Sequence, residues 1–234
     1  ELHRGTLTTQ ALTKKYNRLI ETRLRALEYL CSSLASENYP SEKLDQIWKN
    51  LLMNQFHDII PGSSIRIVYE TAHKEYEKML NDVEQLFSET AELLFEKDEN
   101  RLITVNILSC ESNAPVVLPE GWKGFRITDS NGNMIPLQLE EGKLITQLKI
   151  GATETVCLIK GEAYPVVSEI TDSLILENDL IRYELDETGR ILRAYDKEEN
   201  REVLNNPGNI LSLYVDRPQK WDAWDVDIFY EDQA

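Results

Sequence analysis

Residues 41–62 read SEKLDQIWKNLLMNQFHDIIPG, and this stretch decides how the first half of the chain folds. Its apolar side chains recur at steps of three and four residues, which is the spacing of one face of an α-helix. Ser41 is a favourable N-cap residue, and the pair Pro61-Gly62 stops a helix. We therefore predict one amphipathic helix that begins at Ser41, ends at Pro61-Gly62 and packs through the stripe Leu44, Ile47, Trp48, Leu51, Leu52, Gln55 and Ile59.

The sequence on both sides of this helix has the same period, so residues from about Thr8 to Lys97 are predicted to be helical. The upstream stripe precedes a break at residues 38–41 and comprises Leu12, Tyr16, Leu19, Leu27, Leu30 and Leu34. Downstream, Ser63 or Ser64 is expected to cap a third helix with the stripe Ile65, Val68, Ala72, Tyr76, Met79, Val83, Leu86, Thr90 and Leu93. Three long helices with short connections predict an antiparallel bundle.

Beyond residue 97 the pattern changes to short β-rich runs separated by turn signals. Residues 102–107 are β-rich, the turn at 129–132 is predicted to join hairpin strands at 125–128 and 134–137, and residues 140–143 form another turn. After an expected linker at 163–165, strands are predicted at 174–176, 180–185 and 191–195. The predicted fold class is therefore multi-domain, α then β, with a three-helix bundle followed by antiparallel β-sandwich segments.

These patterns divide the chain into three predicted domains. Residues 1–97 form a helical-bundle domain, residues 98–165 form a small β domain or linker sheet, and residues 166–234 begin a larger, truncated β-sandwich. The first residue is Glu1 rather than an initiator Met. We interpret the chain as a piece of a longer polypeptide, although an expression product or a processed chain would look the same.

The net charge argues against two classes of binding partner, and the cysteine content indicates the cellular compartment. The 234 residues carry a formal net charge of −16, which disfavours binding to nucleic acid or to an anionic membrane surface. No apolar run approaches the ~20 residues that span a bilayer. Cysteine occurs only at Cys31, Cys110 and Cys157 without a zinc-binding spacing, which is typical of reduced thiols in a cytoplasmic protein.

The pair His57-Asp58 at the end of the predicted second helix is the candidate site. On a helical wheel His57 falls opposite the apolar stripe and Asp58 falls on its flank, so neither is expected in the bundle core. A histidine near a helix C-terminus can simply interact with the helix dipole. Alternatively, its imidazole can bind a metal beside a carboxylate that binds a metal or sugar hydroxyls, but a catalytic zinc needs about three protein ligands. Spacing alone leaves both interpretations open.

Three motifs carry a resemblance to a known family. ELHRGTLTTQ at residues 1–10, NQFHDIIPGSSI at 54–65 and DRPQKWDAWDVD at 216–227 resemble the class II α-mannosidases of glycoside hydrolase family 38, in the same order along the chain. The WDAWD segment is more similar to the intracellular and bacterial branch. The resemblance covers nearly the whole chain and implies a helical middle domain followed by the start of the C-terminal β region.

This resemblance implies a function for the candidate site. The family consists of metal-dependent retaining glycosidases that hydrolyse terminal α-linked mannose from glycans, usually with zinc or another divalent metal. By resemblance, His57 is one metal ligand and Asp58 binds the sugar. The nucleophile and the other ligands would belong to an N-terminal catalytic domain that this chain lacks, so no catalytic residue is assigned here and the chain alone is expected to be inactive.

Other residues of the motifs have weaker assignments. His3 and Arg4 could contact substrate at the cleft wall, or they could belong to a frayed terminus. Trp221 and Trp224 could stack on a sugar or pack in the sandwich, and Asp222, Asp225 and Asp227 are interpreted as an acidic loop rather than a catalytic set.

Three readings of the whole chain remain open. The first is part of an α-mannosidase, whose partners are a mannose-containing oligosaccharide and the N-terminal domain. The second is a non-catalytic module that binds carbohydrate or protein. The third is a helical-bundle scaffold in which His57 only interacts with the helix dipole. The sequence also leaves open whether the protein forms homo-oligomers.

Overall fold

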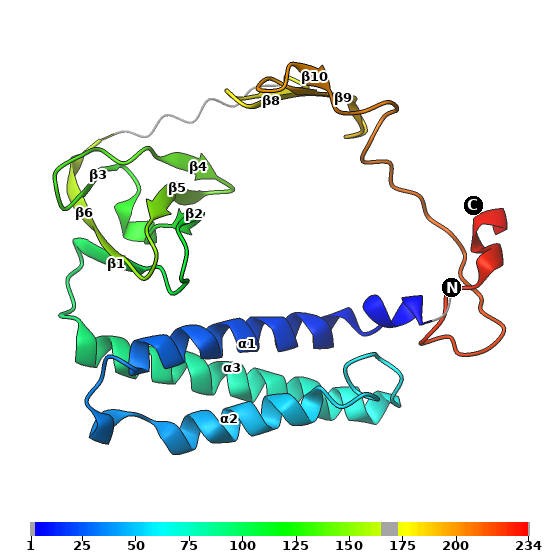
Figure 1. The fold of residues 1–234 in the computed structure, drawn as a ribbon, viewed down its shortest axis with the longest axis horizontal. Helices are drawn as coiled ribbons and strands as arrows, with labels where there is room; N and C mark the ends of the chain where they lie inside the picture. Colours follow the sequence, from blue (N-terminus) through cyan, green and yellow to red (C-terminus); the bar gives the residue numbers. More distant parts are fainter. Residues whose placement is uncertain (1–2, 165–172, 234) are drawn as a thin grey trace. The chain divides into compact units, whose positions relative to one another are not determined.

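The computed structural model describes residues 3–164 and 173–233, and its first part is a bundle of three helices (Figure 1). A short 3-10 helix η1 (Arg4–Leu7) leads into α1 (Ala11–Cys31), and η2 (Ser36–Asn38) lies in the connection to α2 (Ser41–Asn54). The longest helix, α3 (Arg66–Leu94), follows after a loop. The predicted three-helix bundle is therefore confirmed.

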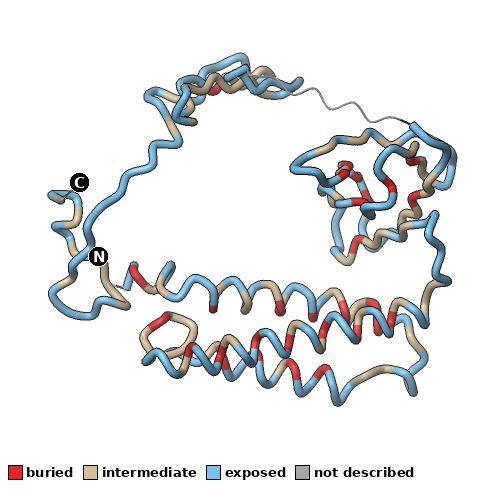
Figure 2. The backbone as a smooth tube through the Cα atoms, turned by 180° about the vertical axis from the view of Figure 1, so that it is seen from behind, coloured by how far each residue is buried: buried red, intermediate tan, exposed pale blue. Residues whose placement is uncertain are grey.

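One apolar core joins the three helices. Buried positions lie along the sides of the helices that face one another (Figure 2). Polar contacts also cross the bundle; for example, Trp48 Nε1 donates to Glu28 Oε1 at 3.1 Å, and Asn54 Nδ2 donates to Glu75 Oε2 at 2.9 Å. The buried members of the core are Ile20, Leu24, Leu27, Cys31, Leu44, Ile47, Leu51, Ala72, Tyr76, Met79, Val83 and Leu86.

The predicted end of the second helix is wrong, because α2 ends at Asn54 and not at Pro61-Gly62. The helix tightens there: the Gln55 N–H bonds to the carbonyls of Leu51 and Leu52, and the following bond, from Phe56 to Met53, has 3-10 spacing. Residues 55–62 then form a series of turns. His57 therefore lies beyond the helix, where the dipole has little influence, since its effect is limited to the terminal turn.

The predicted cap of the third helix is also wrong. The residue at the N-cap of α3 is Ile65, and no side chain caps the helix. The Ser64 hydroxyl instead donates to the carbonyl oxygen of Asp58. This serine therefore stabilises the loop before α3 rather than the helix end.

The small β domain contains two antiparallel three-stranded sheets. The first has the order β1 (Arg101–Val105), β6 (Thr155–Ala163), β3 (Phe125–Asp129). The second has the order β2 (Ser112–Val117), β5 (Lys143–Ile150), β4 (Gln138–Glu140). A short helix, η3 (Glu120–Trp122), places Trp122 in the common core, whose buried members are Leu118, Trp122, Ile127, Leu144, Leu148, Ile150 and Leu158.

The predicted hairpin at residues 125–137 is formed only in part. Strand β3 is present, but it pairs with β6, and the segment after the turn makes a single bridge, Met134 to Thr128. Pro136 has no N–H to continue a ladder, which explains why this segment does not become a strand. The turn at residues 140–143 is confirmed, because it joins β4 to β5.

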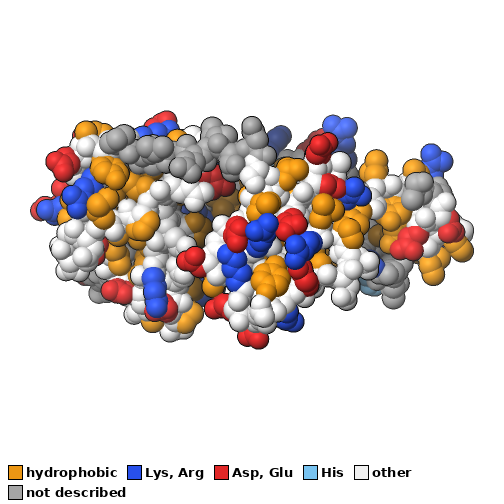
Figure 3. Space-filling view, turned by 90° about the horizontal axis from the view of Figure 1, so that it is seen from above, with side chains coloured by type: hydrophobic (Ala, Val, Ile, Leu, Met, Phe, Trp, Pro, Cys, Tyr) orange, Lys and Arg blue, Asp and Glu red, His pale blue; other side chains and the backbone are white. Residues whose placement is uncertain are grey.

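The remaining strands form one antiparallel sheet in the order β10-β9-β8-β7. Its strands are β7 (Ile175–Glu177), β8 (Ile181–Leu185), β9 (Ile191–Asp196) and β10 (Arg201–Glu202), and a short helix, η4 (Ile228–Gln233), lies near the end of the chain. Within residues 173–217 only Ala194 is buried. Across the sheet Arg193 pairs with Glu184 at 3.0 Å and also with Glu202. Figure 3 shows one face of the whole molecule, on which acidic and basic side chains lie interspersed.

The described residues group into two compact units. The first contains the helices, the small β domain and also Pro218–Val226, and the second contains the sheet β7 to β10 with the segment after residue 226. The antiparallel β elements after the bundle confirm the predicted fold class. The expected linker at 163–165 and the domain boundary after it lie partly outside the described residues.

Candidate functional site

The loop at residues 55–62 presents His57 and Asp58 to solvent. Their side chains are 75% and 51% exposed, and His57 Nε2 lies 3.6 Å from Asp58 Oδ2. The imidazole also contacts the ring of Phe56, with the ring centroids 4.1 Å apart. An exposed imidazole beside a carboxylate can offer nitrogen and oxygen ligands to a metal or hydrogen bonds to a hydroxyl-rich ligand.

Lys14 of α1 ties this loop to the beginning of the bundle. Its half-buried ammonium donates to the carbonyl oxygens of Ile60 at 2.8 Å and Pro61 at 3.4 Å, and it also donates to the carbonyl of Thr9. Burial lowers the pKa of Lys14 below its ordinary value. The loop carbonyls thus replace water around a cation that has lost part of its solvation.

Tyr69 of α3 holds the same loop from the other side. Its ring is buried, and its hydroxyl accepts a bond from the Ser64 N–H at 2.9 Å. The hydroxyl also lies 3.4 Å from the carbonyl oxygen of Asp58 and 3.3 Å from that of Ile59, so its proton can be donated to either. The main chain at Asp58 is therefore held by a buried residue of α3.

Close packing of Gly62 joins the loop to Thr9. Gly62 is buried at φ +100°, and a Cβ added there would lie 2.7 Å from the Thr9 Cγ2 atom and 2.9 Å from its carbonyl oxygen. A side chain at this position would meet both an unfavourable backbone conformation and a backbone atom. Glycine at position 62 therefore allows the loop to lie directly on the N-terminal segment.

The N-terminal segment also contacts the WDAWD motif. The N–H of Gly5 donates to the Trp224 carbonyl at 2.8 Å, and the main-chain N–H of His3 donates to Asp225 Oδ1 at 2.6 Å. The rings of His3 and Trp224 lie 5.0 Å apart between centroids. The first compact unit thus connects the N-terminal motif, the His57 loop and residues 218–226 of the WDAWD motif.

The residues with weaker assignments differ in their exposure and contacts. His3 and Arg4 are both exposed, and His3 contacts Trp224 and Asp225 rather than lying in a frayed end. Trp221 is 69% exposed, at φ +60°, and its carbonyl accepts the N–H groups of Trp224 and Asp225 in a tight turn.

The acidic residues of the motif differ in their contacts. Asp222 is exposed, Asp225 accepts the His3 N–H, and Asp227 accepts the N–H of Phe229 at 3.1 Å. Asp225 and Asp227 also belong to different compact units. The assignment of these acids as an acidic loop stays a prediction.

The donor groups of this chain fit part of a metal site. Among residues 3–164 and 173–233 no group of three His, Cys, Asp or Glu side chains is placed to hold a metal ion. His73, the histidine of α3, lies 3.1 Å from Thr13 Oγ1 through its Nε2 atom, which connects α1 and α3. His57 and Asp58 therefore offer donors, while a complete catalytic zinc shell would need further ligands.

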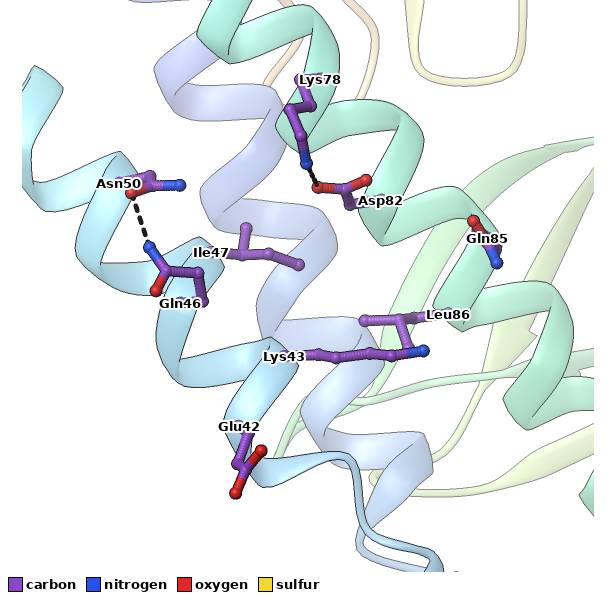
Figure 4. A pocket seen from close by; sticks show the side chains of 9 residues that line it. All are labelled: Glu42, Lys43, Gln46, Ile47, Asn50, Lys78, Asp82, Gln85 and Leu86. Atoms are coloured by element: carbon purple, nitrogen blue, oxygen red, sulfur yellow. Dashed lines mark hydrogen bonds and ion pairs between the residues drawn. The ribbon is translucent and has the colours of Figure 1, made fainter.

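A separate groove of about 480 Å³ lies between α2 and α3 (Figure 4). Charged and amide side chains surround its apolar floor at Ile47 and Leu86, and Lys78 pairs with Asp82 within it. None of the residues that the sequence analysis assigned to the site lines this groove. It therefore does not add to the assignment of His57 and Asp58.

Sequence reasoning missed Lys14, Thr9 and Tyr69 as supports of the site. Tyr69 is not one of the stripe residues predicted for the third helix, and Lys14 has no feature in the sequence that distinguishes it from the neighbouring Lys15. The roles of Lys14 and Tyr69 depend on main-chain carbonyls of a loop that the sequence analysis predicted to be helical, and Thr9 acts through its contacts with Lys14 and Gly62.

Comparison with known proteins identifies the class of protein. Residues 1–94 match the family model described as alpha mannosidase middle domain, and residues 176–234 match the glycosyl hydrolases family 38 C-terminal domain. The chain belongs to glycoside hydrolase family 38, the α-mannosidase family, and carries sequence of its middle and C-terminal domains. The family predicted from the three motifs is confirmed.

Individual relatives agree with this family. The chain is 33% identical to alpha-mannosidase 2C1 of Homo sapiens over 97% of its own length and 22% of that protein. It is 29% identical to alpha-mannosidase G of Dictyostelium discoideum, over 98% of the chain and 25% of the relative. The chain thus spans about a fifth to a quarter of these relatives.

Solved structures support the fold. An alpha-mannosidase from Enterococcus faecalis V583 matches with a TM-score of 0.62 at 16% identity, over 85% of this chain and 29% of that chain. A second structure, a protein of glycosyl hydrolase family 38 from Enterococcus faecalis, matches with a TM-score of 0.64, at 16% identity, over 85% of this chain and 30% of that one. At this identity the likeness concerns the arrangement of elements alone.

Proposed function

We propose that this chain is the middle and C-terminal part of a metal-dependent retaining α-mannosidase that hydrolyses terminal α-linked mannose from glycans. Family membership supports the reaction class, and the exposed His57-Asp58 pair is the single structural observation that carries the site assignment. Its partners are a mannose-containing oligosaccharide and a catalytic domain outside this chain.

In this proposal His57 is one ligand of the metal, zinc or another divalent ion, and Asp58 hydrogen-bonds a hydroxyl group of the sugar. The exposure of the imidazole supports its role, because a ring packed in the bundle core could not reach a metal held by another domain. When bound, the metal supplies Lewis-acid character and a template for the sugar hydroxyls. The chain's own residues bind and orient: Asp58 accepts hydrogen bonds from the sugar hydroxyls, and the bonds to the loop hold the main chain that carries both side chains.

The nucleophile and the acid–base carboxylate are proposed to lie outside this chain. Retaining glycosidases need two carboxyl groups about 5–5.5 Å apart on either side of the scissile bond. We therefore expect no hydrolysis by this chain alone. His3, Arg4 and Trp221 are proposed as weaker substrate contacts, because their side chains are exposed and the segments that carry them are connected to the His57 loop.

The domain division is proposed as 1–97, 98–165 and 166–234. The family-model match to residues 1–94 supports the first domain, and the match to 176–234 supports the last. A cytoplasmic location is also proposed, and the free state of Cys31, Cys110 and Cys157 supports it, since a reducing compartment leaves thiols unpaired. Among the described residues, none of the helices combines the length and the apolar character that a membrane span requires.

Hydrolysis of an aryl α-mannoside by the complete gene product tests the proposal. We expect activity in the natural protein and its loss in His57→Ala and Asp58→Asn, with the helical circular dichroism unchanged. Equal activity in the natural protein and both variants would contradict the site assignment. Binding of mannosides without any hydrolysis by the natural protein would favour the alternative, a non-catalytic carbohydrate-binding module.

A further inference from the structure

We propose that Lys14 is the positioning residue for the His57-Asp58 loop: its ammonium group, fixed on α1, binds the carbonyls at the end of the loop and holds the loop on the N-terminal segment. The inference extends the proposed function, because it names the group that orients the proposed ligand. It concerns the order of the loop, however, and can be tested without metal or substrate.

The hydrogen-bond geometry of Lys14 supports this role. A lysine ammonium has three N–H donors and no acceptor. In this protein the carbonyls of Thr9, Ile60 and Pro61 receive them. Among the described residues no carboxylate lies within ion-pair distance of Lys14, so its protein partners are these three carbonyl groups.

Removal of the ammonium would leave these carbonyls in a partly buried place without their donor. Hydrogen bonds to charged groups contribute more than neutral ones, and an unsatisfied buried acceptor carries a desolvation cost. The neighbouring residue Lys15 lies on the exposed side of α1. The two lysines therefore differ in these contacts while they share helix propensity and formal charge, which makes Lys15 a matched control.

Thr9 extends the effect of Lys14 beyond the loop. Its carbonyl binds the Lys14 ammonium, while its N–H and its hydroxyl bond to the Gly5 carbonyl at 2.9 Å and 2.8 Å. The N–H of Gly5 in turn bonds to Trp224. One continuous series of bonds thus joins the loop of residues 55–62 to the turn at residues 221–225.

Two observables report the order of the loop directly. The amides of Ile59, Ile60 and Gly62 are bonded to carbonyls within the loop at 2.8, 3.1 and 3.2 Å, so their hydrogen exchange measures local opening. The ring protons of His57 give a separate nuclear magnetic resonance signal, which depends on the orientation of the imidazole beside Phe56. If Lys14 only stabilised α1, its replacement would not change these two loop signals selectively.

The experiment compares Lys14→Met with Lys15→Met in this chain, without metal. In Lys14→Met we expect exchange at the three loop amides to rise about tenfold or more, the order expected for loss of hydrogen bonds to a charged group, and the His57 ring signals to shift. Exchange in the middle of α3 should stay as in the unmodified chain. Lys15→Met should change neither observable.

Chemical rescue keeps the test decisive if Lys14→Met does not fold. Lys14→Cys, in a background with Cys110→Ser and Cys157→Ser, is treated with 2-bromoethylamine, which alkylates the thiol and restores an ammonium at nearly the original distance from the backbone. Slow loop exchange should return after alkylation and not after treatment with a neutral alkyl reagent. The inference is overturned if Lys14→Met matches Lys15→Met, or if alkylation restores nothing.

The positioning role of Lys14 and the proposed function of His57 can fail independently of each other. If loop exchange depends on Lys14 but His57→Ala in the complete gene product keeps activity, the positioning stands and the assignment of His57 fails. If His57→Ala abolishes activity while Lys14→Met leaves the loop ordered, the assignment of His57 stands and the positioning role of Lys14 fails.

Discussion

The Nζ atom of Lys14 lies 2.8 Å from the carbonyl oxygen of Ile60, so the first helix is bonded to the loop that follows the second. That loop carries His57 and Asp58, and Tyr69 holds it from the third helix. All three helices therefore take part in placing an exposed His-Asp pair. The bundle has a role beyond a spacer between domains, because it fixes the backbone of the proposed site.

Tyr69→Phe tests the support from the third helix. The substitution keeps the buried ring but removes the hydroxyl that accepts the Ser64 N–H. We expect unfolding free energy to fall by about 1 kcal/mol, the usual net value of one hydrogen bond. Denaturant titration gives this value, and hydrogen exchange should locate the faster amides in residues 58–64. Uniformly faster exchange over all of α3 would show that the hydroxyl stabilises the helix and not the loop.

Gly5→Ala tests the contact between the N-terminal segment and the WDAWD motif. A Cβ at position 5 would lie 3.1 Å from the carbonyl carbon and oxygen of Trp224, so one of the two segments must move. We expect faster hydrogen exchange at the Gly5 position and in residues 221–226. Gly121→Ala is the matched control, because nothing lies within 4 Å of a Cβ there. Indistinguishable exchange in the two variants would contradict the contact.

Leu51→Ala and Leu52→Ala test the core of the bundle with adjacent residues. Leu51 is fully buried, whereas Leu52 is 57% exposed. The first substitution should lower the unfolding free energy by about 2–5 kcal/mol, because it removes buried apolar surface and leaves a cavity. The second should change the unfolding free energy by no more than about 0.5 kcal/mol, as is usual for surface positions. Chemical denaturation of both variants measures the difference, and equal losses would contradict the orientation of α2.

Tyr76 makes the bundle sensitive to alkaline pH. Burial, and to a lesser extent the nearby carboxylate of Glu75, raises the pKa of Tyr76 to about 12, from a model-compound value of 10.0. The folded state therefore keeps a proton that the unfolded state loses above pH 10, so stability is fully present below pH 10 and falls as the pH rises toward 12. Tyr76→Phe should weaken this dependence, and phenolate absorbance should show one late-titrating tyrosine that the variant lacks.

The helices were predictable because their apolar side chains repeat with a clear period. The tertiary pairing of β3 with β6 was not, since Asp129–Gly132 is a strong local hairpin signal and the competing long-range pairing leaves no trace in the sequence. The end of α2 was missed for a related reason. Pro61 and Gly62 stop a helix, but the contacts of Lys14 and Tyr69 with the preceding loop already favour a non-helical backbone there.

The exposure of His57 was predicted correctly from the helical wheel, although its place beyond the end of α2 was not. Whether His57 binds a metal and Asp58 a sugar stays a prediction, because both roles came from the resemblance of residues 54–65 to a family. The donors that would complete the site are proposed to lie in another domain, and no pattern within this chain can reveal them.

Metal content of the complete gene product tests the central claim most directly. Purified natural protein, His57→Ala and His73→Gln are dialysed against the same zinc-buffered solution and analysed by inductively coupled plasma mass spectrometry. The account predicts about one bound metal per polypeptide in the natural protein and in His73→Gln, and strong loss in His57→Ala. Undiminished metal binding by His57→Ala would contradict it.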